Sequence, residues 1–173
     1  MPDALSHDLD EIRASPASAG PVELIVRRPT EEEREVLDQA DLDPVVGLVG
    51  DRWHASASKH GVDTQLTLMN SRTAAVVAGP RSRWALAGDQ LYVDLDLSGA
   101  NLPPGTRLKV GSAVIEVTPE PHTGCGKFLR RFGVDAQKLV NSPAGRELNM
   151  RGINTKIVEA GTVSTGDLIE KLD

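Results

Sequence analysis

The stretch LYVDLDL, residues 91–97, places a large aliphatic side chain at every second position. Because successive side chains of a β-strand point to opposite faces of a sheet, Leu91, Val93, Leu95 and Leu97 are predicted to face a core. The intervening tyrosine and two aspartates are predicted to point to the other side. This pattern is the clearest strand signal in the chain.

Seven further segments have the short length and apolar character of strands. The residues between them favour turns, and the Gly-Asp pairs at 50–51, 88–89 and 166–167 and LPPGT at 102–106 are interpreted as turns. The predicted strands cover residues 22–29, 65–69, 74–78, 107–111, 113–117, 155–160 and 167–172. This pattern favours a mostly β (α+β), compact, β-barrel-like domain with a few short helices over a βαβ sheet.

Helices are predicted at residues 30–40, 81–87, 127–132 and 135–140. In the first of them, Thr30 is the expected N-cap, Glu33 completes a capping box, and the triple glutamate forms a solvated face. Residues 1–20 are predicted to be a weakly docked, flexible N-terminal arm with helical spacing over 5–12, ahead of a single domain at 21–173. Trp84 and Phe128 are expected to pack in a core.

Composition and charge narrow the classes of function. With 173 residues, 39% of them apolar, the chain can bury a core without disulfides or metals. It has no secretory or transit signal and no run of roughly 20 apolar residues, so we expect a cytoplasmic protein without a membrane partner. The net charge of −6 argues against nucleic-acid binding. Residues 1–43 carry net −8 but 122–156 carry net +5, which suits a small anionic ligand or a solvated helix face.

The segment PHTGCGKFLRRFG, residues 121–133, contains the only cysteine, Cys125. A lone cysteine is usually a small buried hydrophobe. Here the flanking Gly124 and Gly126 allow close approach to the sulfur, and the predicted helix places its N-terminus and several basic residues beside it. These features predict a nucleophilic or metal-binding thiolate. A Cys-His hydrolase with His122 as base is the rival interpretation, but the sequence shows no Cys-His-Asn arrangement to support it.

In this region the sequence resembles a MOSC domain, the module named from the C-terminal region of molybdenum cofactor sulfurases. The matching pieces occur in order: GLVGD (47–51), KHGVD (59–63), NLPPGTRLKVGSAVIEVT (101–118), PHTGCGKF (121–128) and RGINTKIVEAGTVSTGD (151–167). The resemblance is strongest over residues 45–170. It implies a β-rich, barrel-like fold in which Cys125 matches the characteristic cysteine of the family.

The resemblance also implies which residues form the site. Cys125 would be the catalytic residue and the molybdenum ligand of a molybdenum-pterin cofactor, and basic residues would hold the pterin phosphate. Each loop residue has a structural alternative, such as a turn, a cap or an ion pair. The candidate cofactor contacts are Lys59, His60, Asp63, Ser98, Asn101, His122 and Arg151. Lys127 and Arg130 are candidates on charge alone, as are Arg72 and Arg146.

Three functions follow from the resemblance. The first is a stand-alone molybdenum-cofactor-binding protein that reduces N-hydroxylated small molecules with electrons from a separate donor protein. The second is a sulfur carrier whose Cys125 persulfide is loaded by a separate pyridoxal-phosphate-dependent cysteine desulfurase. The third is a catalytically silent binding module.

Overall fold

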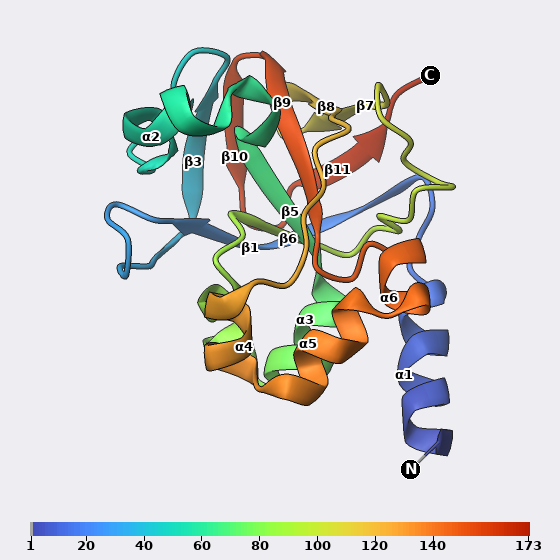
Figure 1. The fold of residues 1–173 in the computed structure, drawn as a ribbon. Helices are drawn as coiled ribbons and strands as arrows, with labels where there is room; N and C mark the ends of the chain where they lie inside the picture. Colours follow the sequence, from blue (N-terminus) through green and yellow to red (C-terminus); the bar gives the residue numbers. More distant parts are fainter. Residues whose placement is uncertain (1) are drawn as a thin grey trace.

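Seven strands close into a β-barrel in the computed structural model, as Figure 1 shows. The structure describes the backbone of residues 2–173, and their side chains except those of 2–5 and 57–60. Around the barrel the strands run β11-β7-β8-β9-β5-β6-β1, and β1 pairs again with β11 to close it. All these pairings are antiparallel except β5–β6. The expected β-barrel-like fold is confirmed.

The strands of the barrel are short. They are β1 (Ala19–Arg27), β5 (Leu66–Asn70), β6 (Leu91–Val93), β7 (Arg107–Val110), β8 (Ala113–Val117), β9 (Ile153–Glu159) and β11 (Leu168–Lys171). An eighth strand of the same sheet, β2 (Glu35–Leu37), pairs antiparallel with the end of β1 and is not part of the closed ring. A separate three-stranded sheet has the order β10-β3-β4, with β3 (Gln39–Asp43), β4 (Gly47–Leu48) and β10 (Gly161–Ser164).

The main core fills the barrel, and the alternation along the strands explains how. In β7 and β8 every second residue is buried, as the period-2 pattern requires. Leu91, Val93, Leu95 and Leu97 all lie in this core, which confirms the interpretation of LYVDLDL, although the regular strand ends at Val93. Tyr92 points the other way, into a second buried cluster under the helices.

Most helices gather at one end of the barrel, at the bottom of Figure 1, and α2 lies at the other end. Their packing buries two further apolar clusters, around Trp84 and Phe128 as predicted. Among the described residues no helix is both long and apolar enough to cross a membrane. The helices are α1 (Pro2–Arg13), α2 (Trp53–His60), α3 (Ser71–Ala78), α4 (Gly126–Phe132), α5 (Val134–Asn141) and α6 (Pro143–Glu147), with 3-10 helices η1 (Val62–Thr64) and η2 (Arg81–Ala87).

The N-terminal segment reaches the core at its end. Ile12, in the last turn of α1, is 3% exposed and belongs to the Phe128 cluster. The buried Ser15 then accepts a hydrogen bond of 2.8 Å from Asn70 Nδ2. Helix α1 ends at Arg13 and β1 begins at Ala19, so only residues 14–18 connect the helix to the barrel.

The predicted helix over residues 30–40 is wrong. Residues 29–32 form bends and turns, and the chain then pairs as β2 with β1. The glutamates of this segment contact basic side chains instead of capping a helix: Glu31 pairs with Lys127, and Glu32 with Arg131. Strand pairing has therefore overridden a local capping signal worth about 1 kcal/mol.

The predicted strand at residues 74–78 is also wrong, because this segment is the second half of α3. Asn70 is the N-cap of that helix, and its side-chain oxygen accepts hydrogen bonds from the N–H groups of Arg72 and Thr73. Two valines gave the segment a β-like composition, yet the cap places them inside a helix. Helices α2 and α6 were not predicted either.

Candidate functional site

Cys125 is the N-cap residue of α4, at the helix-bearing end of the barrel. Its side chain is exposed, and its carbonyl accepts the first helical hydrogen bond from Leu129 N–H at 3.0 Å. The preceding residue is held by Asn141, which accepts from Gly124 N–H at 3.1 Å and donates to the Gly124 carbonyl at 3.3 Å. A Cβ at Gly124 would lie 3.0 Å from a methyl carbon of Val140. The loop therefore packs closely on α5 while the thiol faces outward.

The pKa of the Cys125 thiol is lowered from its ordinary value. Partial burial raises this pKa, but the backbone N–H groups of Phe128 and Lys127 and the charge of Arg151 outweigh it. Unpaired amides at a helix start stabilise a thiolate in this way. A larger fraction of Cys125 is thus ionised, and nucleophilic, at neutral pH than in an ordinary cysteine.

A basic pocket of about 130 Å³ lies beside Cys125. Five arginines and one lysine contribute to its wall, so its electrostatic potential is strongly positive. The pKa of Arg34 is lowered by burial and by the neighbouring charges of Arg131 and Arg28, which shows how closely the cations are crowded. The basic pocket is lined by Arg28, Arg34, Arg52, Thr67, Ala87, Gly88, His122, Cys125, Lys127, Phe128, Arg131 and Arg151.

Asp89 is the buried anchor of this pocket. Its carboxylate is fully buried, pairs with Arg151 NH1 at 2.5 Å, and lies 2.8 Å from His122 Nε2. Burial raises the pKa of Asp89, but the charge of Arg151 and the contact with His122 outweigh it and hold the pKa below its usual range. The Gly-Asp pair at 88–89 is predicted to form a turn, and Gly88 does end η2 in the left-handed conformation, but the Asp89 side chain binds Arg151 and His122 and not a nearby backbone amide.

The other two Gly-Asp pairs do make turns. Asp51 accepts from Trp53 N–H at 3.0 Å and Asp167 accepts from Ser164 N–H at 2.8 Å. Asp51 has a second role, because it also pairs with Arg28 at 2.8 Å, and Arg28 lines the basic pocket. The same dipeptide thus serves a turn, a turn with an ion pair, and a buried anchor.

His122 is held in one tautomer by Asp89. Burial and the charge of Arg151 lower its pKa more than Asp89 raises it, so the ring is neutral at pH 7. An ionised carboxylate only accepts hydrogen bonds, so Nε2 carries the hydrogen and donates it to Asp89. The Nδ1 atom of His122 consequently keeps a lone pair.

Two side-chain donors in the wall of the basic pocket have no partner among the described side chains. Arg151 is 7% exposed; NH1 and NH2 bind Asp89 and the Ala87 carbonyl, but its Nε is buried without a partner. The buried Nε of Arg52 is unpaired as well. Since buried donors without partners cost about 1–3 kcal/mol each, this wall is better satisfied when an acceptor occupies the pocket.

The structure brings together four of the predicted site residues: Cys125, His122, Lys127 and Arg151. Ser98 and Asn101 do not line the basic pocket. Ser98 Oγ accepts from Asn101 N–H, and the Asn101 amide donates to the carbonyls of Ala17 and Asp96, so both serve a turn that holds the N-terminal segment.

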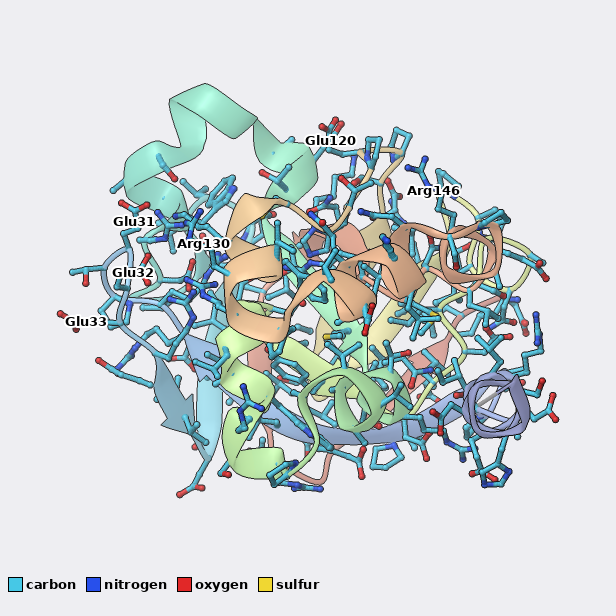
Figure 2. All side chains as sticks on the ribbon, turned by 60° about the horizontal axis from the view of Figure 1, so that its bottom comes forward. Glu31, Glu32, Glu33, Glu120, Arg130 and Arg146 are labelled. Carbon is cyan, nitrogen blue, oxygen red and sulfur yellow. The ribbon has the colours of Figure 1, made fainter. Side chains whose placement is uncertain are left out.

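The remaining predicted contacts lie elsewhere. Asp63 is in η1, where its carbonyl accepts from Thr118, and Arg130 is exposed on α4, as Figure 2 shows. Of the weaker candidates, Arg72 pairs with Asp94, whereas Arg146 donates to the Asn141 carbonyl and lines a hollow next to the basic pocket. The backbone of Lys59 and His60 is in α2, but their side chains lie outside the described residues.

No family model matches the sequence, and no curated protein matches it. Solved structures do match the fold. The YuaD protein from Bacillus subtilis has a TM-score of 0.62 at 20% identity, over 88% of this chain and 95% of that chain. YiiM from Escherichia coli has a TM-score of 0.59 at 22% identity, over 90% of this chain and 70% of that chain. YiiM from Geobacillus stearothermophilus has a TM-score of 0.58 at 13% identity, over 91% and 74%.

The chain has the fold of these proteins. At such low identity the likeness extends to the barrel and its helices, and function has to be argued from the site itself. The site contains residues that sequence reasoning missed: Arg28, Arg34, Arg52 and Asp89. A weak signal for Arg28 was the basic pair Arg27-Arg28, which replaces apolar residues near the end of the predicted strand at 22–29.

Two further hollows lie next to the basic pocket and share His122 with it. One, of about 210 Å³, is lined by His122, Arg151 and parts of α5 and α6, and the other, of about 250 Å³, by His122 and the segment 117–121. His122 therefore forms a wall common to all three. The imidazole is therefore accessible from three hollows that lie next to one another.

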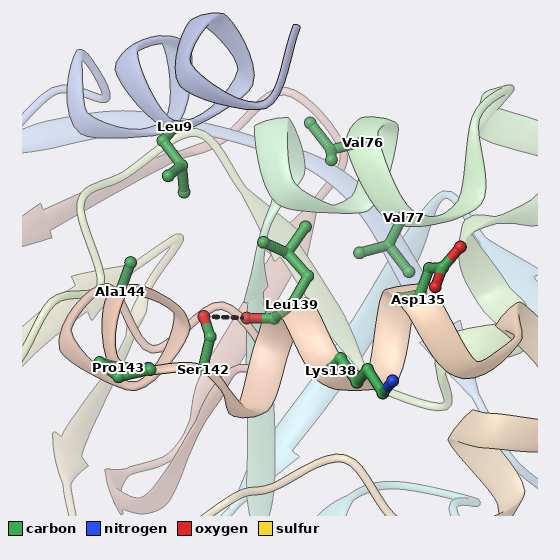
Figure 3. A pocket seen from close by; sticks show the side chains of 10 residues that line it. Leu9, Val76, Val77, Asp135, Lys138, Leu139, Ser142, Pro143 and Ala144 are labelled. Atoms are coloured by element: carbon green, nitrogen blue, oxygen red, sulfur yellow. Dashed lines mark hydrogen bonds between the residues drawn. The ribbon is translucent and has the colours of Figure 1, made fainter. Parts of the chain in front are cut away.

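A larger hollow is a different kind of surface. The apolar groove, of about 1100 Å³, lies between α1, α3, α5 and α6 and is lined mainly by Leu9, Val76, Val77, Leu139 and Ala144 (Figure 3). Of its charged residues, Asp135 and Lys138, neither makes an ion pair among the described side chains. The groove lacks the converging polar groups that fix a ligand for chemistry, so the basic pocket is the better candidate site.

Proposed function

We propose that the chain is a member of the MOSC family and binds a molybdenum cofactor at the basic pocket. The observation that carries the proposal is one exposed cysteine, favoured as thiolate, at the wall of a pocket with six cationic side chains. The β-barrel is the fold that the sequence resemblance implies. Fold and site chemistry thus support the same family.

The residues present fit such a cofactor. A thiolate is a soft ligand suited to molybdenum, and arginine and lysine bind phosphate through charge-assisted hydrogen bonds. The unpaired Nε atoms of Arg52 and Arg151 provide donors for an anion. No group of three or more His, Cys, Asp or Glu side chains among the described residues could hold a metal ion. A metal at Cys125 therefore needs ligands of its own, which a metal-carrying cofactor brings.

The size of the site is consistent with a ligand that extends beyond the basic pocket. That pocket alone, at about 130 Å³, is smaller than the roughly 300–1,000 Å³ of typical ligand pockets. A cofactor of ordinary size would therefore have to extend into the hollows of about 210 and 250 Å³ that share His122 with this pocket. His122 and Arg151 would then contact the ligand from the middle of the site.

The chain's own residues divide the work. Cys125 would donate a sulfur electron pair to the metal, while Arg52, Lys127 and Arg131 would hold the phosphate. Asp89 orients Arg151 and fixes His122 with its Nδ1 lone pair free to accept a proton or a hydrogen bond. When bound, the cofactor supplies two-electron redox chemistry.

The reaction proposed from the resemblance is reduction of an N-hydroxylated small molecule. The N–O bond breaks, two electrons and two protons are consumed, and the products are an N–H group and water. The electrons come from a separate donor protein.

Metal analysis tests this function. Protein expressed with molybdenum available should contain molybdenum and pterin in proportion to chain, and Cys125→Ala should lose the molybdenum. Arg130→Ala is the matched control, because Arg130 is a basic α4 residue that does not line the basic pocket. Wild-type protein without molybdenum, or a Cys125→Ala variant that retains it, would contradict the proposal.

A sulfur carrier is the second candidate function, favoured by the exposure of Cys125. The thiolate would attack the terminal sulfur of a persulfide on a cysteine desulfurase, forming a new S–S bond while the donor cysteine leaves as thiolate. An exposed sulfur can be reached by another protein. Cyanide-labile sulfur on metal-free protein, lost in Cys125→Ala, would support this function over cofactor binding.

A further inference from the structure

The three consecutive glutamates, residues 31–33, lie in the turn after β1 and beside α4 (Figure 2). Glu31 pairs with Lys127 and Glu32 pairs with Arg131 at 3.2 Å. Both cations line the basic pocket. The acidic turn therefore supplies counter-charges to the site from outside.

The cations of the basic pocket are neutralised in two different ways. Arg28 and Arg151 pair with Asp51 and Asp89, whose side chains are fully buried, so these pairs are fixed parts of the fold. Lys127 and Arg131 have only Glu31 and Glu32 as salt-bridge partners among the described side chains. These two glutamates are 63% and 72% exposed. The outer pairs can separate without unfolding the barrel.

Arg34 connects the acidic turn to the pocket wall. Its guanidinium donates to the carbonyls of Glu31 and Glu33 in the turn and to Ala85 in η2. Because Arg34 also lines the basic pocket, the turn is held next to the entrance by the same side chain. The pKa of Glu31 is lowered, first by its contact with Lys127 and then by the charges of Lys127 and Arg52.

We propose that Glu31 and Glu32 are an internal counter-anion of the basic pocket, which an anionic ligand displaces from Lys127 and Arg131 when it binds. The ligand class is an oxyanion or phosphate monoester, whose several oxygens can contact more than one cation, whereas each glutamate contacts one. Exposed ion pairs contribute little to stability, so exchange of one anion for another is easy. The glutamates thereby reduce binding of weakly charged anions and select for multiply charged ones.

This proposal rests on the proposed function only in taking the basic pocket as a binding site, and it can be tested without molybdenum. Cys125 is the only thiol in the chain, so its reaction with aromatic disulfides reports on the entrance alone. The Cys125 thiolate forms an S–S bond to one half of the reagent, the reagent S–S bond breaks, and the other half leaves as a coloured thiolate. The dianionic reagent is dithiobis(nitrobenzoate), and dithiodipyridine is its neutral counterpart.

The variants are Glu31→Gln, Glu32→Gln and the double variant, with Glu33→Gln as matched control. Glu33 carries the same charge in the same turn but makes no ion pair among the described side chains. In the double variant the dianionic reagent should react about three- to tenfold faster at low ionic strength, because two repelling charges are gone. The rate with the neutral reagent should change less than about twofold. The rate increase with the dianionic reagent should be smaller in 0.5 M salt.

Inorganic phosphate gives a second measurement. Phosphate should slow the reaction of Cys125, and the half-protecting concentration should fall in the double variant but not in Glu33→Gln. Equal effects of Glu31→Gln, Glu32→Gln and Glu33→Gln on the dianionic reagent would overturn the proposal, because only net charge would then matter. Absence of phosphate protection in all variants would overturn it too. Neither result depends on whether the chain binds molybdenum.

Discussion

At the scale of single residues, Asp89 holds Arg151 and His122 in place in the wall of the basic pocket. It is the only carboxylate that touches both Arg151 and His122 among the described side chains, and it is fully buried. A buried guanidinium needs such a partner, because removing a charge from water is expensive without one. Asp89 therefore explains why an arginine can lie 7% exposed beside the aromatic ring of Phe128.

Asp89→Asn should lower the free energy of unfolding by about 3 kcal/mol or more, because Arg151 loses its buried counter-charge. Asp94→Asn is the control. It removes a carboxylate from the Arg72 pair, whose side chains are 30% and 23% exposed, and should cost less than about 1 kcal/mol. Urea unfolding of both variants measures the difference. Equal costs would mean that Asp89 is not the anchor described here.

The lowered pKa of Cys125 predicts its reactivity. The rate of alkylation by a neutral reagent such as iodoacetamide should reach half its maximum at a pH below 9.0, the ordinary pKa of the thiol. The thiolate is the reacting form, so the pH–rate profile reports its pKa. Glutathione under the same conditions is the comparison. A midpoint at or above that of glutathione would contradict the effect of the helix amides.

At the scale of secondary-structure elements, the alternation of apolar residues predicted the strands of the barrel well. The two wrong predictions both lie in segments that contain or follow a helix-capping signal. Strands such as β7 and β8 were predictable because half-buried strands alternate strictly. Residues 74–78 were misassigned because an apolar run of five residues has no period, and the deciding signal was the cap Asn70 further back. The helix expected at 30–40 does not form because residues 35–37 pair with β1, and the local capping pattern gave no sign of this pairing.

The corner between α5 and α6 depends on one glycine. A Cβ at Gly145 would lie 2.2 Å from the Leu139 carbonyl oxygen and 2.6 Å from that of Val140. Gly145→Ala should therefore lower the free energy of unfolding by roughly 1–3 kcal/mol, although alanine is the better helix former. Gly99→Ala is the control, since nothing lies within 4 Å of the added carbon. Thermal unfolding that is unchanged in Gly145→Ala would contradict this packing.

At the scale of the whole molecule, the fold assembles the site from distant segments. The basic pocket combines residues from 28–34, 52, 67, 87–88, 122–131 and 151. Sequence reasoning could find Cys125 and its helix because their signals are local. It could not find Arg28, Arg34 or Arg52, because their nearness to Cys125 results from strand pairing and not from any spacing along the chain.

Closure of the barrel joins the two ends of the sequence, since β11 pairs with both β1 and β7. Ile169 is fully buried in this closing strand, and its neighbour Leu168 is 52% exposed. Ile169→Ala should lower the global free energy of unfolding by about 2–5 kcal/mol. Leu168→Ala should change it by less than about 0.5 kcal/mol. If Ile169→Ala instead left urea unfolding unchanged, the strand would not be part of the cooperative unit.

Acid sensitivity of the whole fold should depend on His122. Its pKa is lowered in the folded state, so below pH 6.5 the unfolded chain binds a proton that the folded chain does not. Stability should therefore fall as the pH drops below 6.5, by at most about 1.4 kcal/mol per pH unit from this group.

His122→Gln should flatten the dependence of stability on pH between about pH 6.5 and 5, because glutamine does not titrate. Below about pH 4 the variant and the wild type should lose stability together, because the pKa of Asp89 is lowered in the folded chain, so this carboxyl takes up a proton in the unfolded chain but not in the folded one. Unfolding free energies measured from pH 8 to pH 3 test this, and equal slopes above pH 5 would show that His122 is not held neutral.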